Sequence, residues 1–166
     1  MRRSEPSAEG RLVREESVST GEAVEYAWDS RGQLVEAVFK DASDVVTKRV
    51  AYQYDALGRK IGKQVDDDGD DDFDRATRYV YDSAGKSDSN GIGGLDDVVL
   101  VFDDSGSLTN RYLHGSGVDE ILADEDALNE VLWGLADHLG TVRDLARYDA
   151  GTDTTSIASH RSYDSF

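Results

Sequence analysis

The chain contains 166 residues, 38% hydrophobic and 32% charged, and carries a formal net charge of −17. This length is sufficient for one domain with a hydrophobic core. The excess of acid argues against binding to nucleic acid, which the surface would repel. The apolar runs are far too short for a transmembrane helix, which needs roughly 20 residues, and the absence of cysteine excludes disulfides and thiolate metal sites.

Residues 1–21 are polar and charged and show no sustained hydrophobic period. We expect this N-terminal segment to be disordered or weakly ordered, with at most an edge strand through Leu12 and Val13. From residue 22 onward, short β-rich runs alternate with Gly, Asp and Ser. Residues 22–166 are therefore predicted to form one β array.

The segment from Tyr52 to Ile61 carries the clearest local pattern in the chain and indicates the tip of a β-hairpin. Tyr52 and Tyr54 are two residues apart and therefore share one face of an extended strand. Asp55 suits the first position of a four-residue turn, because its carboxylate accepts hydrogen bonds from backbone amides two residues later. Gly58 suits the fourth position, because glycine tolerates a positive φ. A returning strand is predicted to follow.

The same aromatic–Asp–x–x–Gly unit recurs along the chain, sometimes in a looser form, and this predicts a repeat protein. Its aspartates are separated by 26, 27, 21, 34 and 27 residues, and the intervals 21 and 34 together make two periods of about 27. We therefore expect stacked antiparallel hairpins, with all regular structure in strands and tips at 29–32, 55–58, 82–85, 103–106 and 137–140. The aspartates of the units are Asp29, Asp55, Asp82, Asp103, Asp137 and Asp164.

Three stretches resemble the RHS, or YD-repeat, proteins of bacteria. They are Tyr52–Arg59, Asn110–Glu125 (NRYLHGSGVDEILADE) and Trp133–Asp144 (WGLADHLGTVRD), the last of which is similar to the segment leading into the conserved RHS core. The sequence departs from the family pattern at Ser116 and Gly134, where relatives often have proline. Both replacements are compatible with loops.

The resemblance, which covers roughly residues 24–166, implies that the chain forms part of the wall of a β shell. In this family a spiral ribbon of hairpins encloses a C-terminal toxin or effector polypeptide. The implied partners are therefore further RHS repeats or such a toxin polypeptide. The resemblance also implies a secreted or cell-surface protein, although no signal peptide is visible in this chain. The last unit, Tyr163–Phe166, lacks its turn glycine, so we expect an array truncated at its C-terminal end that self-associates through open sheet edges.

One segment leaves the choice between helix and strand open. Residues 119–132 carry apolar side chains at a spacing that suits one face of a helix. The polar residues 125–130 instead suit a turn between two short apolar strands. The family resemblance favours strand, turn and strand.

No catalytic constellation is visible, so we do not expect an enzyme. Many RHS proteins release their toxin with an aspartyl autoprotease, but its characteristic Asp-Pro segment has no counterpart here, because the only proline is Pro6. No catalytic residue is carried over from the family. His114, His138 and His160 lack metal-ligand spacing and are interpreted as hydrogen-bonding loop residues. No cofactor is expected apart from the calcium considered next.

The densest acidic stretch is Asp66–Asp74. Alternate carboxylates in a turn can supply the oxygen ligands that Ca²⁺ prefers, and the first three have the spacing of an EF-hand loop. The glycine and the glutamate that an EF-hand needs at its sixth and twelfth positions are absent, so the stretch is not an EF-hand. Two alternatives stay open, a solvated hairpin loop and a Ca²⁺ site. The candidate ligands of the Ca²⁺ site are Asp66, Asp68, Asp70 and Asp72.

The main alternative function is a cell-surface binding module, which would bind glycans through its aromatic residues or Ca²⁺ through the acidic stretch. A stripe of exposed rings would suit sugars. We interpret the aromatic residues mainly as stacking pairs between neighbouring hairpins, which stabilise a sheet. The set comprises Tyr26, Trp28, Tyr52, Tyr54, Tyr79, Tyr81, Phe102, Tyr112 and Trp133.

Overall fold

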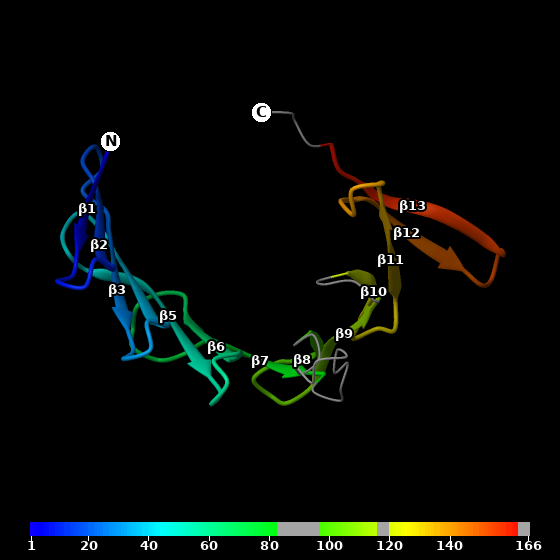
Figure 1. The fold of residues 1–166 in the computed structure, drawn as a ribbon, viewed down its shortest axis with the longest axis horizontal. Coiled ribbons are helices and arrows are strands. Elements are labelled where there is room, and N and C mark those ends of the chain that lie inside the picture. The colour runs from blue at the N-terminus through cyan, green and yellow to red at the C-terminus, as the bar shows by residue number, and fades with distance from the viewer. Residues whose placement is uncertain (83–96, 116–119, 163–166) are drawn as a thin grey trace, which may run out of the picture. The chain divides into compact units, whose positions relative to one another are not determined.

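The computed structural model describes residues 1–82, 97–115 and 120–162, and every regular element in these ranges is a β-strand (Figure 1). The strand order is the order of the sequence, and the strand pairs are antiparallel. The predicted all-β fold of stacked antiparallel hairpins is therefore confirmed. The described part of the ambiguous segment, 120–132, contains strand, turn and strand. Within the described ranges, no helix has the length and apolar character needed to cross a membrane.

The chain divides into two compact units, Met1–Arg78 and Tyr79–Phe166. The first unit contains β1 (Arg2–Pro6), β2 (Leu12–Ser17), β3 (Ala23–Trp28), β4 (Leu34–Lys40), β5 (Val46–Tyr54), β6 (Lys60–Asp66) and the first half of β7 (Arg75–Tyr81). The second unit contains the rest of β7, β8 (Val98–Phe102), β9 (Leu108–His114), β10 (Ile121–Asp126), β11 (Val131–Ala136), β12 (Val142–Asp149) and β13 (Thr154–His160).

The N-terminal segment 1–21, which the sequence predicts to be disordered or weakly ordered, contains β1 and β2 in this structure. Leu12 and Val13 lie in β2, which pairs with β1 on one side and with β3 on the other. The turn between β1 and β2 is built like the other hairpin tips. The amide of Gly10 donates to the carbonyl of Ser7 at 3.0 Å, and the Ser7 hydroxyl accepts from backbone amides as an aspartate would.

One turn geometry recurs at the hairpin tips of both units. At Asp29 the carboxylate accepts the amides of Arg31 at 2.9 Å and Gln33 at 2.8 Å, while the amide of Gly32 donates to the Asp29 carbonyl at 3.1 Å. The fourth residue has a positive φ, +84° at Gly32. The same hydrogen bond, from the amide of the fourth residue to the carbonyl of the first, closes the turns that begin at Asp41, Asp55, Asp103, Asp126 and Asp137. A short polar residue that accepts amides therefore starts each of these turns.

The tips predicted at 29–32, 55–58, 103–106 and 137–140 are confirmed. The tip predicted at 82–85 falls largely outside the described residues. The sequence missed a further tip at 41–44, because its fourth residue is Asp44 instead of glycine, with a φ of 62°. The turn predicted within residues 125–130 is confirmed at 126–129, where Asn129 takes the fourth position with a φ of 61°. Asn and Asp enter the left-handed region more readily than other side chains.

A β-bulge follows six of these turns. After the turn at 29–32, Trp28 pairs with Leu34 but Ala27 pairs with Glu36, so Val35 is an extra residue in the returning strand. The corresponding register shifts put an extra residue at Val13, Thr47, Ile61, Thr109 and Arg143. A bulge reverses the inward and outward alternation of the strand. Which face a returning side chain occupies therefore does not follow from simple alternation after the turn.

The two faces of the first unit differ in chemistry. One cross-strand row runs through Tyr26, Ala37, Val50 and Val65, and the last three of these are at most 6% exposed. We call the face that carries this row the apolar face of the first unit. Tyr52 shares this face, since it lies two residues from Val50 on β5.

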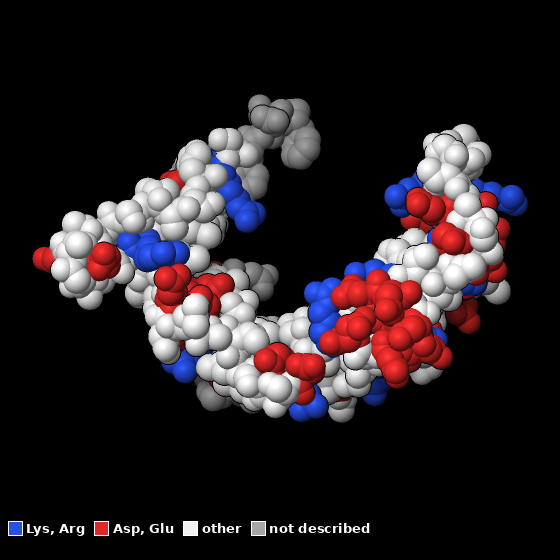
Figure 2. All heavy atoms as spheres, turned by 180° about the vertical axis from the view of Figure 1, so that it is seen from behind, with Lys and Arg blue, Asp and Glu red and all other residues white. Residues whose placement is uncertain are grey.

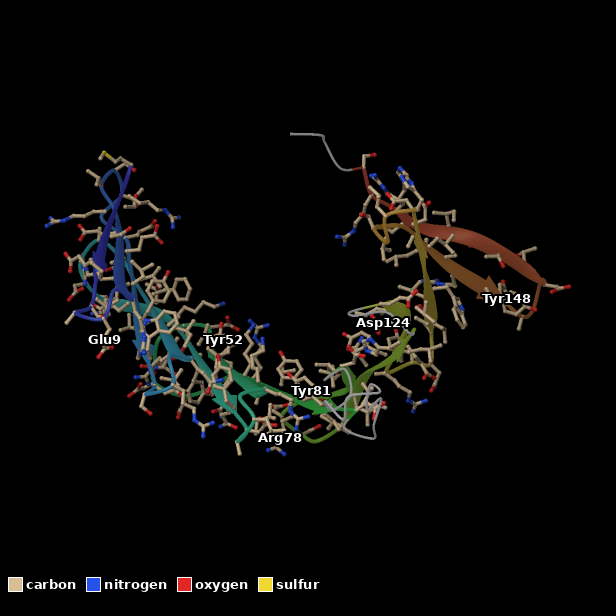
Figure 3. The ribbon with its side chains drawn as sticks, in the orientation of Figure 1. Glu9, Tyr52, Arg78, Tyr81, Asp124 and Tyr148 are labelled. Carbon is tan, nitrogen blue, oxygen red and sulfur yellow. The ribbon has the colours of Figure 1, made fainter. Side chains whose placement is uncertain are left out.

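The opposite face carries ion pairs, and we call it the ionic face of the first unit. Its row runs from Arg14 through Glu25 and Val38 to Arg49. Arg14 lies 2.5 Å from Glu25, and Arg49 lies 2.9 Å from Glu36. Figure 3 shows Tyr52 and Arg78 on opposite sides of the sheet. The buried apolar row and the row of ion pairs thus lie on different faces of one layer, and Lys63 lies beside Tyr52 on the face of the apolar row.

Aromatic side chains that precede the turn aspartates connect neighbouring hairpins. Trp28 Nε1 donates to the carbonyl of Leu12 at 2.8 Å, and Tyr54 Oη donates to the carbonyl of Leu34 at 2.9 Å. His114 occupies the equivalent position in the second unit, with Nε2 2.8 Å from the carbonyl of Val98. The sequence predicted stacking for Trp28 and Tyr54, and the structure adds a polar role at the ring tip.

Replacing Tyr54 with phenylalanine is expected to lower the free energy of unfolding by about 1 kcal/mol, because the Leu34 carbonyl loses its partly buried donor. Burial raises the pKa of Tyr54, so the hydroxyl stays a donor at neutral pH. Urea denaturation of Tyr54→Phe against Tyr52→Phe provides the measurement, since Tyr52 does not precede the turn aspartate. Equal stabilities of the two variants would contradict this role.

Candidate functional site

The loop between β6 and β7, residues 66–74, is the most concentrated group of acidic side chains in the chain, and we call it the acidic loop. It contains seven aspartates, and on the face drawn in Figure 2 acidic side chains gather in a dense patch beside basic ones. Its first residue, Asp66, is 1% exposed. The Asp66 carboxylate accepts the amides of Gly69 at 2.6 Å, Asp71 at 3.1 Å and Asp68 at 3.2 Å. Asp66 therefore organises the loop from its base.

The acidic loop folds back on the start of β5. Gly69 has a φ of +79°, and its α-carbon lies so close to the strand that an added Cβ would be 2.3 Å from the carbonyl oxygen of Val46. Lys48 Nζ lies 2.7 Å from Asp67, and Arg75 Nε also lies 2.7 Å from Asp67. These cations offset part of the charge that the loop concentrates.

The environments of the loop carboxylates separate their pKa values. Hydrogen bonds from Arg75 and then Lys48 lower the pKa of Asp67 to about 2. Burial works against ionisation of Asp66, but the amides of Gly69, Asp71 and Asp68 outweigh it and lower the pKa. The pKa of Asp68 is raised, first because the negative charge of Asp70 is close. A nearby cation would therefore offset the repulsion between Asp68 and Asp70.

The structure brings together only part of the predicted calcium set. Carboxylate oxygens of Asp66, Asp68 and Asp74 lie within 4.8 Å of one another. Asp70 and Asp72, which the sequence also proposed, are not in this group and instead form short turns, with the Asp72 amide donating to Asp70 at 2.9 Å. Spacing alone missed Asp74, because the loop closes through the Asp67 amide, which donates to Asp74 at 2.7 Å.

Calcium binding by the acidic loop stays a prediction. We expect millimolar Ca²⁺ to raise the melting temperature, and the double variant Asp68→Asn/Asp74→Asn to remove the rise. The matched control is Asp70→Asn/Asp72→Asn, which removes the same charge outside the group of three. Mg²⁺ should act less, because it keeps its water ligands. Equal shifts with both ions, or equal losses in both double variants, would indicate charge screening instead.

Lowering the pH is expected to destabilise the acidic loop. A carboxylate whose pKa is lowered by folding contributes stability above its unfolded pKa, about 3.9, and that stability is lost as the pH falls through the folded value. For Asp67 the window therefore runs from about pH 4 to about pH 2. When thermal melts are recorded between pH 7 and pH 2, the melting temperature of the parent chain should decrease within this window. The fall should be shallower for Asp67→Asn, and identical pH profiles would contradict the assignment.

The three histidines lie apart, and each described ring has its own surroundings. His160 Nδ1 is 2.6 Å from Asp144 across the pair of β12 and β13. His138 lies in the turn at 137–140, and His114 lies at the end of β9. The residue of the acidic loop that sequence reasoning missed is Asp74, because it lies outside the alternate spacing on which the calcium prediction rests.

The fold and the repeated tip define a class, a single-layer β-hairpin repeat protein with a common turn and hydrogen bonds between successive hairpins. No family model matches the chain. Over 76 residues, 44% of its length, the chain is 34% identical to a protein of Dickeya dadantii (strain 3937) named probable deoxyribonuclease RhsB. The chain spans 5% of the length of that relative.

Two solved structures align with most of this chain at low sequence identity. The Photorhabdus luminescens Tc holotoxin pore with a TccC3 mutation aligns with 94% of this chain and 9% of its own, at 14% identity and a TM-score of 0.45. The TcdB2–TccC3 structure without its hypervariable C-terminal region aligns with 92% and 10%, at 7% identity and a TM-score of 0.31. The 76-residue similarity to RhsB agrees with the RHS resemblance seen in the sequence and indicates an RHS-repeat-like region.

Proposed function

We propose that this chain is a structural RHS-repeat segment, part of a β shell that encloses a toxin or effector polypeptide, and that it performs no catalysis of its own. The observation that carries the proposal is the hydrogen bonding between successive tips. Arg31 donates to the Ala56 carbonyl at 2.9 Å, and the Gln33 side chain donates to the Gly58 carbonyl at 2.8 Å. Identical tips that dock on one another allow a wall to grow by adding hairpins.

The buried apolar row on one face of the first unit supports the same proposal. Only seven apolar side chains in the described ranges are buried, and all seven are alanine or valine within strands. The ionic face suits water, whereas the apolar face, with Tyr26 and Tyr52, offers contacts to an enclosed and incompletely folded chain. In this arrangement the apolar face of the first unit is the inner surface.

The absence of cysteine gives this proposal a direct test. A single cysteine is introduced as Tyr52→Cys on the apolar face or as Arg78→Cys on the ionic face (Figure 3). Maleimide labelling is then compared between the isolated chain and the product of the complete gene. We expect Tyr52→Cys to be labelled much more slowly in the complete product and Arg78→Cys to be labelled equally in both. Equal labelling of Tyr52→Cys in both forms would contradict enclosure.

The outer strands suggest a second measurement. Among the described strands, β1 and β13 each have a hydrogen-bonded neighbour on one side only. All seven residues of β13 are exposed, and open strand edges pair readily with other strands. We therefore expect light scattering to show self-association of the isolated chain. A compact monomer that melts cooperatively would argue for a finished domain and against the shell segment.

A further inference from the structure

Two lysines of β6 lie on the apolar face of the first unit. Lys63 pairs with Tyr52, which lies on that face. Lys60 pairs with Tyr54, and alternate residues such as Tyr52 and Tyr54 share one side of β5. In a regular strand, side chains three residues apart point to opposite faces. The bulge at Ile61 adds a residue between the lysines, so both lie on one face, two strand positions apart.

Positive charge gathers on this face, although the chain has 35 acidic residues against 18 lysines and arginines. The acidic residues of β4 to β7 are Glu36 and Asp66, which pair with Ala51 and Arg49 and therefore lie on the ionic face. The strands β5 to β7 place only cations among the charged side chains of the apolar face. These cations are Lys48, Lys60, Lys63 and Arg75.

The acidic loop reaches some of these cations and leaves others. Lys48 and Arg75 both lie 2.7 Å from Asp67. Within the described ranges, no acidic side chain forms an ion pair with Lys63. Lys60 is exposed, and its Nζ lies 5.7 Å from the centre of the Tyr52 ring. A ring attracts a cation without neutralising it, so the ammonium group can still bind an anion.

We call Tyr52, Tyr54, Lys60 and Lys63 the lysine–tyrosine patch, and its spacing fits an extended acidic peptide. Such a peptide rises about 3.3 Å per residue, so its alternate side chains repeat every ~7 Å on one face. The two lysines lie two strand positions apart and have the same repeat. Successive alternate carboxylates of a peptide that follows β6 therefore meet Lys60 and Lys63 in turn. The Tyr52 ring offers an apolar contact to the methylene groups of those acidic side chains.

A nucleic acid fits the patch less well. Every nucleotide carries a phosphate, so a strand that follows β6 would continue past the patch towards the acidic loop, which contains seven aspartates. The net charge of −17 also repels a long polyanion. A polypeptide needs acidic side chains only where it meets the two lysines.

We propose that the lysine–tyrosine patch binds an extended acidic segment of a polypeptide. The patch lies within the first unit and is formed by this chain alone. The proposal rests on the proposed function in one respect, since enclosure makes this face the inner surface and supplies the polypeptide that occupies it.

Fluorescence anisotropy with a labelled peptide of alternating Glu and Thr, titrated with the 166-residue chain, tests the proposal. We expect saturable binding that weakens as the salt concentration rises. A peptide with Gln in place of Glu should bind about tenfold more weakly. The variant Lys60→Gln/Lys63→Gln should lose affinity for the acidic peptide by about tenfold. Lys60→Arg/Lys63→Arg keeps both charges and should bind within a few-fold of the parent.

The matched control is Arg3→Gln/Arg78→Gln, which removes the same charge from the ionic face of the first unit. Arg3 pairs with Glu16 on that face, and Arg78 lies on the side of the sheet opposite Tyr52 (Figure 3). This variant should keep the parental affinity within about twofold. None of the substituted side chains is buried, and a parental far-UV spectrum confirms that each variant folds.

Several results would overturn the proposal. One is the absence of saturable binding of the acidic peptide, and another is equal binding of the Gln peptide. Equal losses in the lysine and arginine double variants, Lys60→Gln/Lys63→Gln and Arg3→Gln/Arg78→Gln, would show that only the overall charge matters. A loss in Lys60→Arg/Lys63→Arg as large as in the glutamine variant would show that charge is not what binds. Binding of oligothymidylate that needs both lysines, without binding of the acidic peptide, would assign the patch to a nucleic acid.

These outcomes are distinct from those of the labelling experiment. If the acidic peptide binds through the two lysines but Tyr52→Cys is labelled equally in both forms, the patch stands and enclosure fails. If Tyr52→Cys is protected in the complete product but the acidic peptide does not bind, enclosure stands and the preference for an acidic segment fails.

Discussion

Replacing Gly69 with alanine is expected to lower the free energy of unfolding of the first unit by about 3 kcal/mol or more. Two penalties combine at this position. The residue has a φ of +79°, where a side chain costs roughly 1 kcal/mol or more. The added Cβ would also lie 2.3 Å from the Val46 carbonyl oxygen and 2.7 Å from its carbon. Both atoms belong to the backbone of β5, so relief requires the acidic loop to move away from the strand.

Gly10→Ala is the matched control, because it carries the first penalty without the second. Gly10 has a φ of +81°, and no atom lies within 4 Å of an added Cβ. We expect a loss of about 1 kcal/mol there. Urea denaturation of the two variants separates backbone conformation from steric contact. Equal losses of unfolding free energy would show that the acidic loop moves away from β5 without a further loss of stability. Its packing on Val46 would then contribute nothing to stability.

The tips show how far a turn can be predicted from sequence. Asp followed three residues later by Gly identified four of the described tips, because each position has a local physical reason. The tip at 41–44 was missed because Asp44 takes the left-handed conformation that the pattern reserves for glycine. The turn at 126–129 also lacks glycine, since Asn129 takes that conformation, and it was predicted only from its polar residues. The tip at 103–106 also lies at the opposite edge of the second unit from 137–140, since successive turns of a meander alternate between edges. The period of about 27 residues therefore mixed turns from both edges.

The acidic loop shows where local reasoning ends. The sequence presents seven aspartates with nothing to distinguish them, and spacing selected Asp66, Asp68, Asp70 and Asp72. The structure distinguishes them by contacts with distant residues, since Gly69 packs on Val46 and Asp67 pairs with Lys48. These contacts fix which carboxylates face one another, and no periodicity in the loop encodes them.

The aromatic residues divide by position in a similar way. Trp28 and Tyr54 follow the repeat pattern and bond to the neighbouring hairpin, as their place before the turn aspartate suggests. Trp133 and Tyr148 are neighbours only through the register of β11 on β12. That register depends on the bulge at Arg143, which the alternation of residues in the sequence does not reveal.

Replacing Asp66 with alanine should lower the melting temperature by roughly 10 °C, the second large effect expected in the first unit. The carboxylate is 1% exposed and is the acceptor for the amides of Asp68, Gly69 and Asp71. Alanine leaves these donors without an acceptor at a site that water reaches poorly, and buried unpaired amides are costly.

Two further variants provide melting temperatures with which that of Asp66→Ala is compared. Asp66→Asn keeps one acceptor oxygen and should give an intermediate loss. Asp70→Ala removes an acceptor for a single amide, that of Asp72, at an exposed position where water can replace it, so its melting temperature should change little. Circular dichroism melts at pH 7 provide the measurement. If Asp66→Ala and Asp70→Ala have the same melting temperature, the buried carboxylate does not organise the acidic loop. The low pKa of Asp66 would then reflect the charges around it instead of the amides that donate to it.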